Sequence, residues 1–318
     1  MKRSVKILCI VAGGLVCLGL IIGALGRAFK GTFNVGIFNV GSFNTGFVGM
    51  TVTEADILTE TKELQPFNEL EIQASLTDVI INKGDKYSLE ISAPEELMPE
   101  VSEENGKLII KQPKVSSISL VGGKIFYKLS VPSDDVIDAH IDLSSGDISV
   151  NDVNVKGTLS QSSGELKMSG VRSDYLNLSS SSGEAELGDC MVKDINIEHT
   201  SGDIVLGCVG ADKISVKSTS GDISFDAVVA EDELSAEITS GDIEGKDCSF
   251  KNVSINGTST EVKLGLRGSV SDYDYSIDSN TGDIKVDTME MERSYKTNSG
   301  ADRKIVVDTT SGDVEITF

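Results

Sequence analysis

The sequence contains no tryptophan, only two histidines and 5% aromatic residues among its 318 positions. Catalytic sites need acids, bases and nucleophiles grouped on one face, and glycan-cleaving sites usually add aromatic platforms. The sequence places no such group of catalytic or aromatic residues around His140 or His199. We therefore expect a protein that is not an enzyme, with His199 at the surface or at the edge of a structural repeat.

Positive charge is also scarce, because 28 Lys and Arg residues face 50 Asp and Glu residues and give a formal charge of −22. A chain of this sign is repelled by polyanions and kept soluble by its own charge. Nucleic acid is therefore excluded as a main partner, and so are surfaces of anionic lipid.

Proline is absent from the long carboxyl-terminal part of the chain. The five prolines are Pro66, Pro94, Pro99, Pro113 and Pro132, so the 186 residues that follow the last one contain none. Proline removes a donor from a β-ladder and is excluded from central strands. This distribution predicts that every strand after residue 132 is a central one.

Cysteine is rare, and no CxxC pair occurs. Cys190 and Cys208 are separated by eighteen residues, close to one structural repeat, so we expect them to lie as neighbours inside the fold. These two are expected to fill space as buried thiols, rather than form a disulfide or a metal pair, and Cys248 is the one further cysteine outside the amino-terminal run. We expect no metal site and no cofactor.

The chain does contain a phrase that recurs about every nineteen residues. It reads SGDI at Ser145, Ser201, Ser220 and Ser240, and it has close variants elsewhere. The variants are SGEL at Ser163, SGEA at Ser182, TGDI at Thr281 and SGDV at Ser311. A fixed period in this range indicates a stacked-repeat architecture.

Between the glycines of this phrase, apolar residues alternate with polar ones over four to six positions, as in Ile195 and Ile197 or Ile214 and Val216. This period is typical of half-buried strands, and no stretch after residue 65 has helical spacing. We predict an all-β fold, a parallel β-solenoid with one coil per nineteen residues. Its coil should be right-handed, as are about 98% of parallel crossovers.

Turn geometry is sufficient to explain the residues of the repeated phrase. Glycine takes a positive φ without cost, so a tight corner in each coil needs glycine at the same place. Thr260 stands where this glycine is expected, and that corner should therefore differ.

Two rows of polar side chains should run along the stacked corners. The acids of the phrase are Asp147, Glu165, Glu184, Asp203, Asp222, Asp242, Asp283 and Asp313. The hydroxyl residues that precede it are Ser144, Ser162, Ser181, Thr200, Thr219, Thr239 and Thr310, interrupted by Asn280. We expect the acids to accept turn hydrogen bonds, with cation binding between coils as the alternative. The hydroxyls are expected to be turn and ladder residues without a catalytic role.

The amino terminus carries an uncharged, apolar run of twenty residues, 7–26, which matches the thickness of a bilayer core. We predict a cytoplasmic tail at 1–6, a transmembrane helix at 7–26, and an extracellular carboxyl-terminal domain, since basic residues concentrate before the span. A cleaved secretory signal is the alternative. Residues 27–65, rich in Gly, Phe and Asn, are expected to be a juxtamembrane spacer, with the solenoid at 66–318. Within it, 66–139 should form irregular coils and 140–318 the regular repeats.

The stretch from Pro66 to Pro132 contains LEIQASLTDVIINKGD, ENGKLIIKQ and IFYKLSVPSD in this order, before the SGDI coils begin. This order resembles the DUF4097 family of adhesin-like bacterial proteins over about 66–318. The resemblance implies a parallel β-solenoid of the bacterial envelope and carries no catalytic motif. Many relatives lack the Phe-Asn-Gly segment at 31–47, so its role cannot be taken from the family.

We therefore predict a membrane-anchored, non-catalytic binding or scaffolding surface at the cell membrane, with an envelope protein or a wall polymer as the candidate partner. A regulator that senses envelope stress and acts on a membrane signalling partner is the main alternative. A glycan-active β-helix enzyme is the least favoured. Binding residues should be sought on the outward positions between the corners, which vary from coil to coil.

Overall fold

The computed structural model describes residues 56–114, 124–132 and 136–318. Within these ranges the chain forms twenty-four β-strands and two short 3₁₀ helices, and no α-helix. No helix in the described part is long and apolar enough to cross a bilayer. The predicted tail and membrane helix, residues 1–26, and the predicted spacer up to residue 55 lie outside the described residues.

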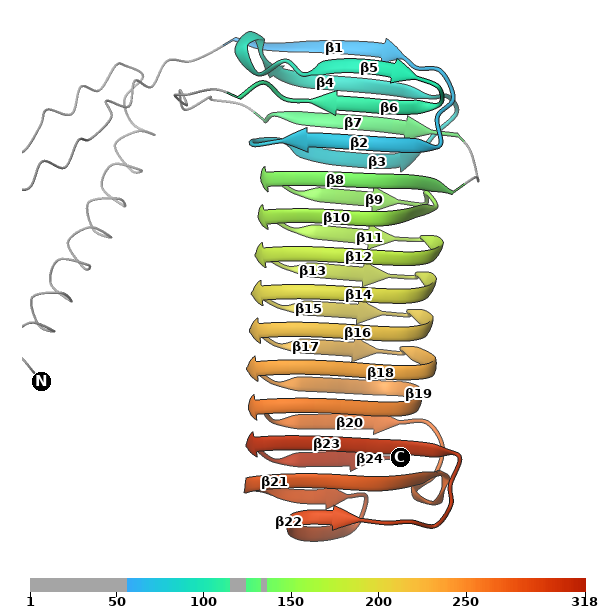
Figure 1. The fold of residues 1–318 in the computed structure, drawn as a ribbon, viewed down its shortest axis with the longest axis vertical. Coiled ribbons are helices and arrows are strands. Elements are labelled where there is room, and N and C mark those ends of the chain that lie inside the picture. Colours follow the sequence, from blue (N-terminus) through green and yellow to red (C-terminus); the bar gives the residue numbers. More distant parts are fainter. Residues whose placement is uncertain (1–55, 115–123, 133–135) are drawn as a thin grey trace, which may run out of the picture. The chain divides into compact units, whose positions relative to one another are not determined.

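Residues Ile57–Lys114 and Lys124–Phe318 form one compact unit, whose centre is a stack of two-strand coils (Figure 1). One strand of each coil belongs to a front sheet: β8 (Ile137–Ser145), β10 (Val155–Ser163), β12 (Arg172–Ser182), β14 (Met191–Ser201), β16 (Gly210–Ser220) and β18 (Val229–Ser240). The other belongs to a back sheet: β9 (Ile148–Asn151), β11 (Leu166–Ser169), β13 (Ala185–Gly188), β15 (Ile204–Gly207) and β17 (Ile223–Asp226). β19 (Ile243–Ser259) runs through both sheets, and β20 (Val262–Leu266) follows it in the back sheet.

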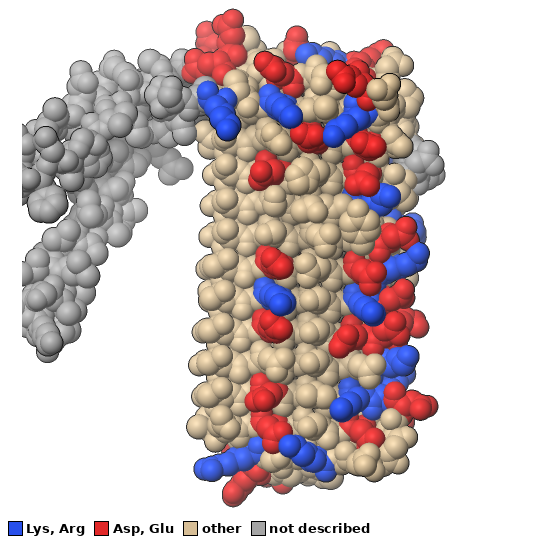
Figure 2. Space-filling model, in the orientation of Figure 1, with Lys and Arg blue, Asp and Glu red and all other residues tan. Residues whose placement is uncertain are grey.

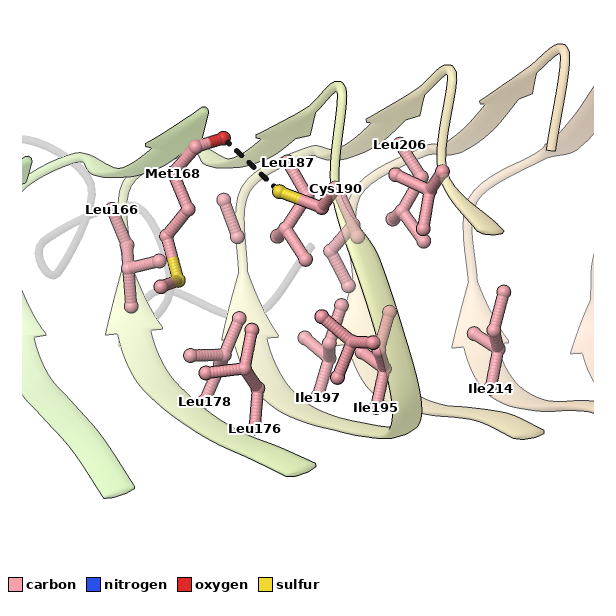
Figure 3. Packing of buried hydrophobic residues seen from close by; sticks show 14 of the residues in the cluster. Leu166, Met168, Leu176, Leu178, Leu187, Cys190, Ile195, Ile197, Leu206 and Ile214 are labelled. Atoms are coloured by element: carbon pink, nitrogen blue, oxygen red, sulfur yellow. Dashed lines mark hydrogen bonds between the residues drawn. The ribbon is translucent and has the colours of Figure 1, made fainter. Parts of the chain in front are cut away.

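Each central strand pairs in parallel with the equivalent strand of the next coil. Leu176 lies opposite Ile195, and Ile195 lies opposite Ile214, so one coil is nineteen residues long, as the motif spacing predicts. The alternating apolar residues of both sheets point inward. Figure 3 shows Leu178 and Ile197 of the front sheet facing Leu166 and Leu187 of the back sheet across the core.

The glycine of the repeated phrase forms the corner between the front and back strands. Gly202 has a φ of +124°, and a Cβ atom there would lie 1.9 Å from the carbonyl oxygen of Gly183 in the preceding coil. No side chain fits this space, which explains why glycine recurs. The corner at Thr260 differs as expected, because Thr260 is not among the described residues with positive φ. Its buried side chain lies over Gly257, where a Cβ would be only 2.8 Å away.

Each central coil also has a second left-handed corner, which the sequence pattern did not reveal. It follows the back strand and falls on Asp152, Gly170, Asp189, Cys208, Ala227 and Asp247, all with φ between +52° and +68°. Asp occupies three of these six positions and Gly, Cys and Ala the others, so only the spacing of 18 to 20 residues is common to all of them. The residue after the corner points inward and is fully or almost fully buried, as with Val209 and Val228.

The amino-terminal end departs from a simple stack. β2 (Glu69–Ala74) and β3 (Asp78–Lys83) pair with β8 and β9, and on their other side with β6 (Lys107–Lys111) and β7 (Phe126–Val131). The outer strands β1 (Ile57–Glu63), β4 (Ser88–Pro94) and β5 (Glu100–Glu104) are antiparallel to their neighbours. The predicted spacer therefore ends earlier than residue 65. β1 was missed because its apolar residues do not alternate with polar ones, and only Ile57 and Lys62 are partly buried.

The carboxyl-terminal end is also reordered. β21 (Tyr273–Val286) turns back through Asp287, with φ of +53°, into the antiparallel strand β22 (Met289–Lys296). The last strands, β23 (Arg303–Ser311) and β24 (Val314–Thr317), then lie between β19–β20 and β21. Stacking in sequence order is therefore wrong for the last two coils, since the hairpin at Asp287 prevents β21 from leading directly into a further coil.

Candidate functional site

The acids of the repeated phrase lie in line along one edge of the stack, and most of the aspartates bind backbone of the neighbouring coil. The carboxylate of Asp147 accepts a hydrogen bond from the backbone N–H of Glu165 at 2.8 Å, and that of Asp203 accepts one from Asp222 at 3.0 Å. Asp242 binds Glu261 in the same way at 3.2 Å. The aspartate side chain is long enough to reach the corner N–H of the next coil, which would otherwise have no hydrogen-bond acceptor.

Glutamate replaces aspartate at two of these corners, and its longer side chain reaches elsewhere. Glu165 forms an ion pair with Lys167 at 3.2 Å, and no described hydrogen bond joins it to the next coil. No group of three or more His, Cys, Asp or Glu side chains within the described ranges is arranged to hold a metal ion. The aspartates of the ladder stabilise corners through the hydrogen bonds described above.

A column of buried polar side chains lies beneath the same corners. Gln161, Ser180, His199 and Ser218 occupy equivalent inward positions in four successive coils. The Nε2 atom of His199 lies 3.0 Å from the carbonyl oxygen of Gly183. His199 is therefore buried at the coil edge and does not lie on the surface, and burial lowers its pKa below the usual value for histidine.

The expected stacking of Cys190 on Cys208 is wrong. Gly188 pairs with Gly207, so the register advances by nineteen residues, and a spacing of eighteen places Cys208 one residue out of line. Cys208 falls on the left-handed corner and is exposed, whereas Cys190 and Cys248 are buried. Burial raises the pKa of both buried thiols.

The hydroxyl row lies where the front strands end, and we call it the hydroxyl edge. Its members are exposed and occupy one position per coil: Ser144, Ser162, Ser181, Thr200, Thr219, Thr239, Thr258 and Thr310. Figure 2 shows an uncharged band along this edge of the front sheet, the end at which the arrows of β8 to β18 point in Figure 1.

An open groove of about 620 Å³ lies along the middle of the hydroxyl edge. Ser181, Thr200, Thr219 and Thr239 line it, and their hydroxyls have no hydrogen-bond partner among the described residues. Adjacent coils are about 4.8 Å apart, so these four hydroxyls span about 14 Å. The arrangement offers aligned, unused donors and acceptors to a ligand that lies along the stack.

The other side of the groove is charged, and the sequence pattern did not single out these residues. Glu198, Lys217, Glu237 and Asn256 line it, with Lys217 and Glu237 paired at 3.3 Å. All four stand two residues before a member of the hydroxyl edge. This spacing is the sequence signal from which they could have been identified. Because the lysine is paired with one of the two acids, the groove carries little net charge of its own.

Comparison with solved structures finds matches at low identity, and the TM-scores of three of them are below 0.5. A candidate adhesin from Bacteroides fragilis is 13% identical, with a TM-score of 0.45 over 82% of this chain and 97% of that one. A candidate adhesin from Parabacteroides merdae is 15% identical, with a TM-score of 0.48 over 82% and 96%. A candidate lipid-binding protein from Parabacteroides distasonis is 16% identical, with the same score and coverage as the Parabacteroides merdae protein.

A search of curated proteins finds no match. The family model described as Toastrack DUF4097, however, matches residues 67–317. This range begins just before β2 and ends with β24, so it covers the regular coils and both reordered ends except for β1. The chain belongs to the DUF4097, or Toastrack, family.

Proposed function

We propose that this chain is a non-catalytic binding protein of the cell envelope and that the groove along the hydroxyl edge is its contact surface. The observation that carries the proposal is the row of four exposed hydroxyls without protein partners, one per coil, beside a groove. The acids, by contrast, are engaged in corners, and His199 is buried under one. The hydroxyls of the groove, in contrast, are free for a ligand.

The geometry favours an extended, polar partner with little negative charge. A partner that lies along the stack meets an equivalent hydroxyl every 4.8 Å or so, and a chain with its own repeated polar groups can match several at once. The formal charge of −22 opposes a polyanion. A neutral wall polymer or a polar segment of an envelope protein meets both conditions.

The proposal includes the anchor and the orientation expected from the amino terminus. The helix at 7–26 would hold a right-handed solenoid on the outer side of the membrane, with residues 1–6 in the cytoplasm. Protease added to intact cells tests this arrangement. Loss of the carboxyl-terminal domain before the membrane is opened supports it, and protection of that domain until lysis contradicts it.

The partner can be sought by crosslinking in intact cells followed by capture of the chain. Recovery of wall polymer or of an envelope protein crosslinked to the segment 179–256 supports the proposal. Recovery of a membrane signalling protein through another face would favour the regulatory alternative. A chain that is captured alone would contradict a binding role.

A further inference from the structure

The groove along the hydroxyl edge has one acid more than it has bases. Its lining contains Glu198 and Glu237 but only one lysine, Lys217. These three side chains stand opposite one another on successive front strands, and Lys217 pairs with Glu237 at 3.3 Å. Glu198 forms no ion pair or hydrogen bond with any described residue. One carboxylate, which can only accept hydrogen bonds, therefore faces the groove unpaired.

A buried acceptor in the same lining also lacks a donor. His199 is 5% exposed, and its Nε2 atom lies 3.0 Å from the carbonyl oxygen of Gly183. A carbonyl oxygen only accepts, so Nε2 carries the proton of the neutral ring and Nδ1 is left as an acceptor. Nδ1 has no hydrogen-bond partner in the part of the chain that the structure describes. The groove therefore favours a ligand that brings donors.

A second row of acids follows the hydroxyl edge on its corner side. In each regular coil the acid of the repeated phrase stands three residues after the hydroxyl residue, as Asp203 does after Thr200. At the four coils of the groove these exposed or half-exposed acids are Glu184, Asp203, Asp222 and Asp242. The corner segments 181–184, 200–203, 219–222 and 239–242 contain no lysine or arginine. The hydroxyls of the groove thus lie between two rows in which acids predominate, and such a field attracts cations.

An ammonium group meets these conditions, since it carries a positive charge and three donors and has no acceptor. Its hydrogen bond to Glu198 would be charge-assisted and therefore stronger than the neutral bonds that the hydroxyls exchange with water. The groove is lined by no Phe or Tyr on which a neutral sugar ring could stack. A neutral ligand would therefore gain less from this groove than one with an ammonium group.

Spacing favours a sugar chain over a peptide as the carrier of the ammonium group. Along the stack the hydroxyls repeat about every 4.8 Å, whereas side chains on one face of an extended peptide repeat about every 6.6 Å. A peptide that lies along the groove falls out of register within two coils. A sugar chain has several hydroxyls on each unit, so that one of them can meet the row at each coil.

We propose that the groove binds a glycan with free amino groups, whose hydroxyls contact the hydroxyl edge and one of whose ammonium groups pairs with Glu198. This inference rests on the groove being the contact surface proposed above. It adds the sign of the partner's charge and the acid that recognises that charge.

The test is fluorescence anisotropy of the full chain, purified in detergent, with two labelled β-1,4-linked oligosaccharides of equal length. One consists of glucosamine with free amines and the other of N-acetylglucosamine. At about pH 6 glutamate is ionised, and most of the sugar amines are protonated. We expect the amine form to bind at least tenfold more tightly, and the difference to shrink as salt is added.

Two variants place the recognised charge. Glu198→Gln should weaken binding of the amine form at least threefold and leave binding of the acetylated form unchanged. Glu244→Gln removes the same charge from an exposed position in the back sheet, outside the groove, and should bind both sugars as the wild type does. Equal affinity of the wild type for the two sugars, or equal affinity of the wild type and Glu198→Gln for the amine form, would overturn the proposal.

The variant with Thr200→Val, Thr219→Val and Thr239→Val separates this inference from the proposed function. If it loses the amine form while Glu198→Gln keeps it, the groove is the contact surface and its charge preference is wrong. If it binds the amine form as the wild type does, the groove is not the contact surface and both fail. A serine-rich peptide with as many lysines as the sugar has amines, bound more tightly than the sugar, would contradict the choice of a glycan.

Discussion

The carboxylate of Asp222 accepts a hydrogen bond of 2.9 Å from the backbone N–H of Asp242, the equivalent residue one coil further on. We predict that Asp222→Ala lowers the free energy of unfolding by about 1 kcal/mol, the usual net worth of one hydrogen bond. Asp222→Glu should lose a similar amount although it keeps the charge, because Glu165 makes no such bond. Urea denaturation measures both, and an Asp222→Glu variant as stable as the wild type would contradict the geometry.

Gly202 and Gly207 belong to the same coil but meet opposite surroundings. A Cβ at Gly202 would lie 1.9 Å from a backbone oxygen, with φ at +124°, while a Cβ at Gly207 meets nothing within 4 Å. We predict that Gly202→Ala destabilises the fold by about 3 kcal/mol or more. Gly207→Ala should stay within about 0.5 kcal/mol of the wild type. Thermal unfolding of the pair checks this, and equal melting temperatures would refute the assigned role of the corner.

His199 should make stability depend on pH in a defined direction. Its pKa is lowered in the folded state, so the neutral ring is favoured there, and the unfolded chain takes up its proton first as pH falls. The stabilisation is complete above about pH 6.5, the ordinary pKa of histidine, and is lost as pH falls from there toward the lower folded pKa.

The matched variant for this prediction is His199→Ser, which places at 199 the residue found in the same column at Ser180 and Ser218. Urea midpoints between pH 5 and pH 8 should fall more steeply toward acid for the wild type than for the variant. Parallel curves would show that His199 does not titrate as its burial requires.

Thiol reactivity should distinguish the three cysteines of the described coils. Cys208 is exposed, whereas Cys190 and Cys248 are buried with raised pKa values, and the thiolate is the reactive form. We predict that iodoacetamide at pH 8 labels Cys208 in the native protein and reaches the other two only after unfolding. Peptide mapping by mass spectrometry reads out each site. Native labelling of Cys190 would contradict the register that places it inside.

The regular coils were predictable from the sequence because glycine recurs at the corners and apolar residues alternate with polar ones along the strands. The nineteen-residue period is therefore visible in the sequence. The second corner, which falls on Cys208 in one coil, was not, since Asp, Gly, Cys and Ala all occupy it and no single residue type marks every coil. The insertion of β23–β24 depends on the hairpin at Asp287, whose effect on strand order is not local. Glu198 and Lys217 could have been found from their position two residues before Thr200 and Thr219, but the groove beside them is visible only in the structure.

The measurement that tests the account most directly is retention of purified protein on isolated cell envelopes, compared between two triple variants. Thr200→Val, Thr219→Val and Thr239→Val remove three hydroxyls from the groove and keep β-branched side chains. Thr158→Val, Ser215→Val and Ser235→Val remove three partly buried hydroxyls from the same sheet outside it. We predict that the groove variant loses retention at least tenfold while the control binds as the wild type does. Equal retention of all three proteins would contradict the hydroxyl edge as the binding surface.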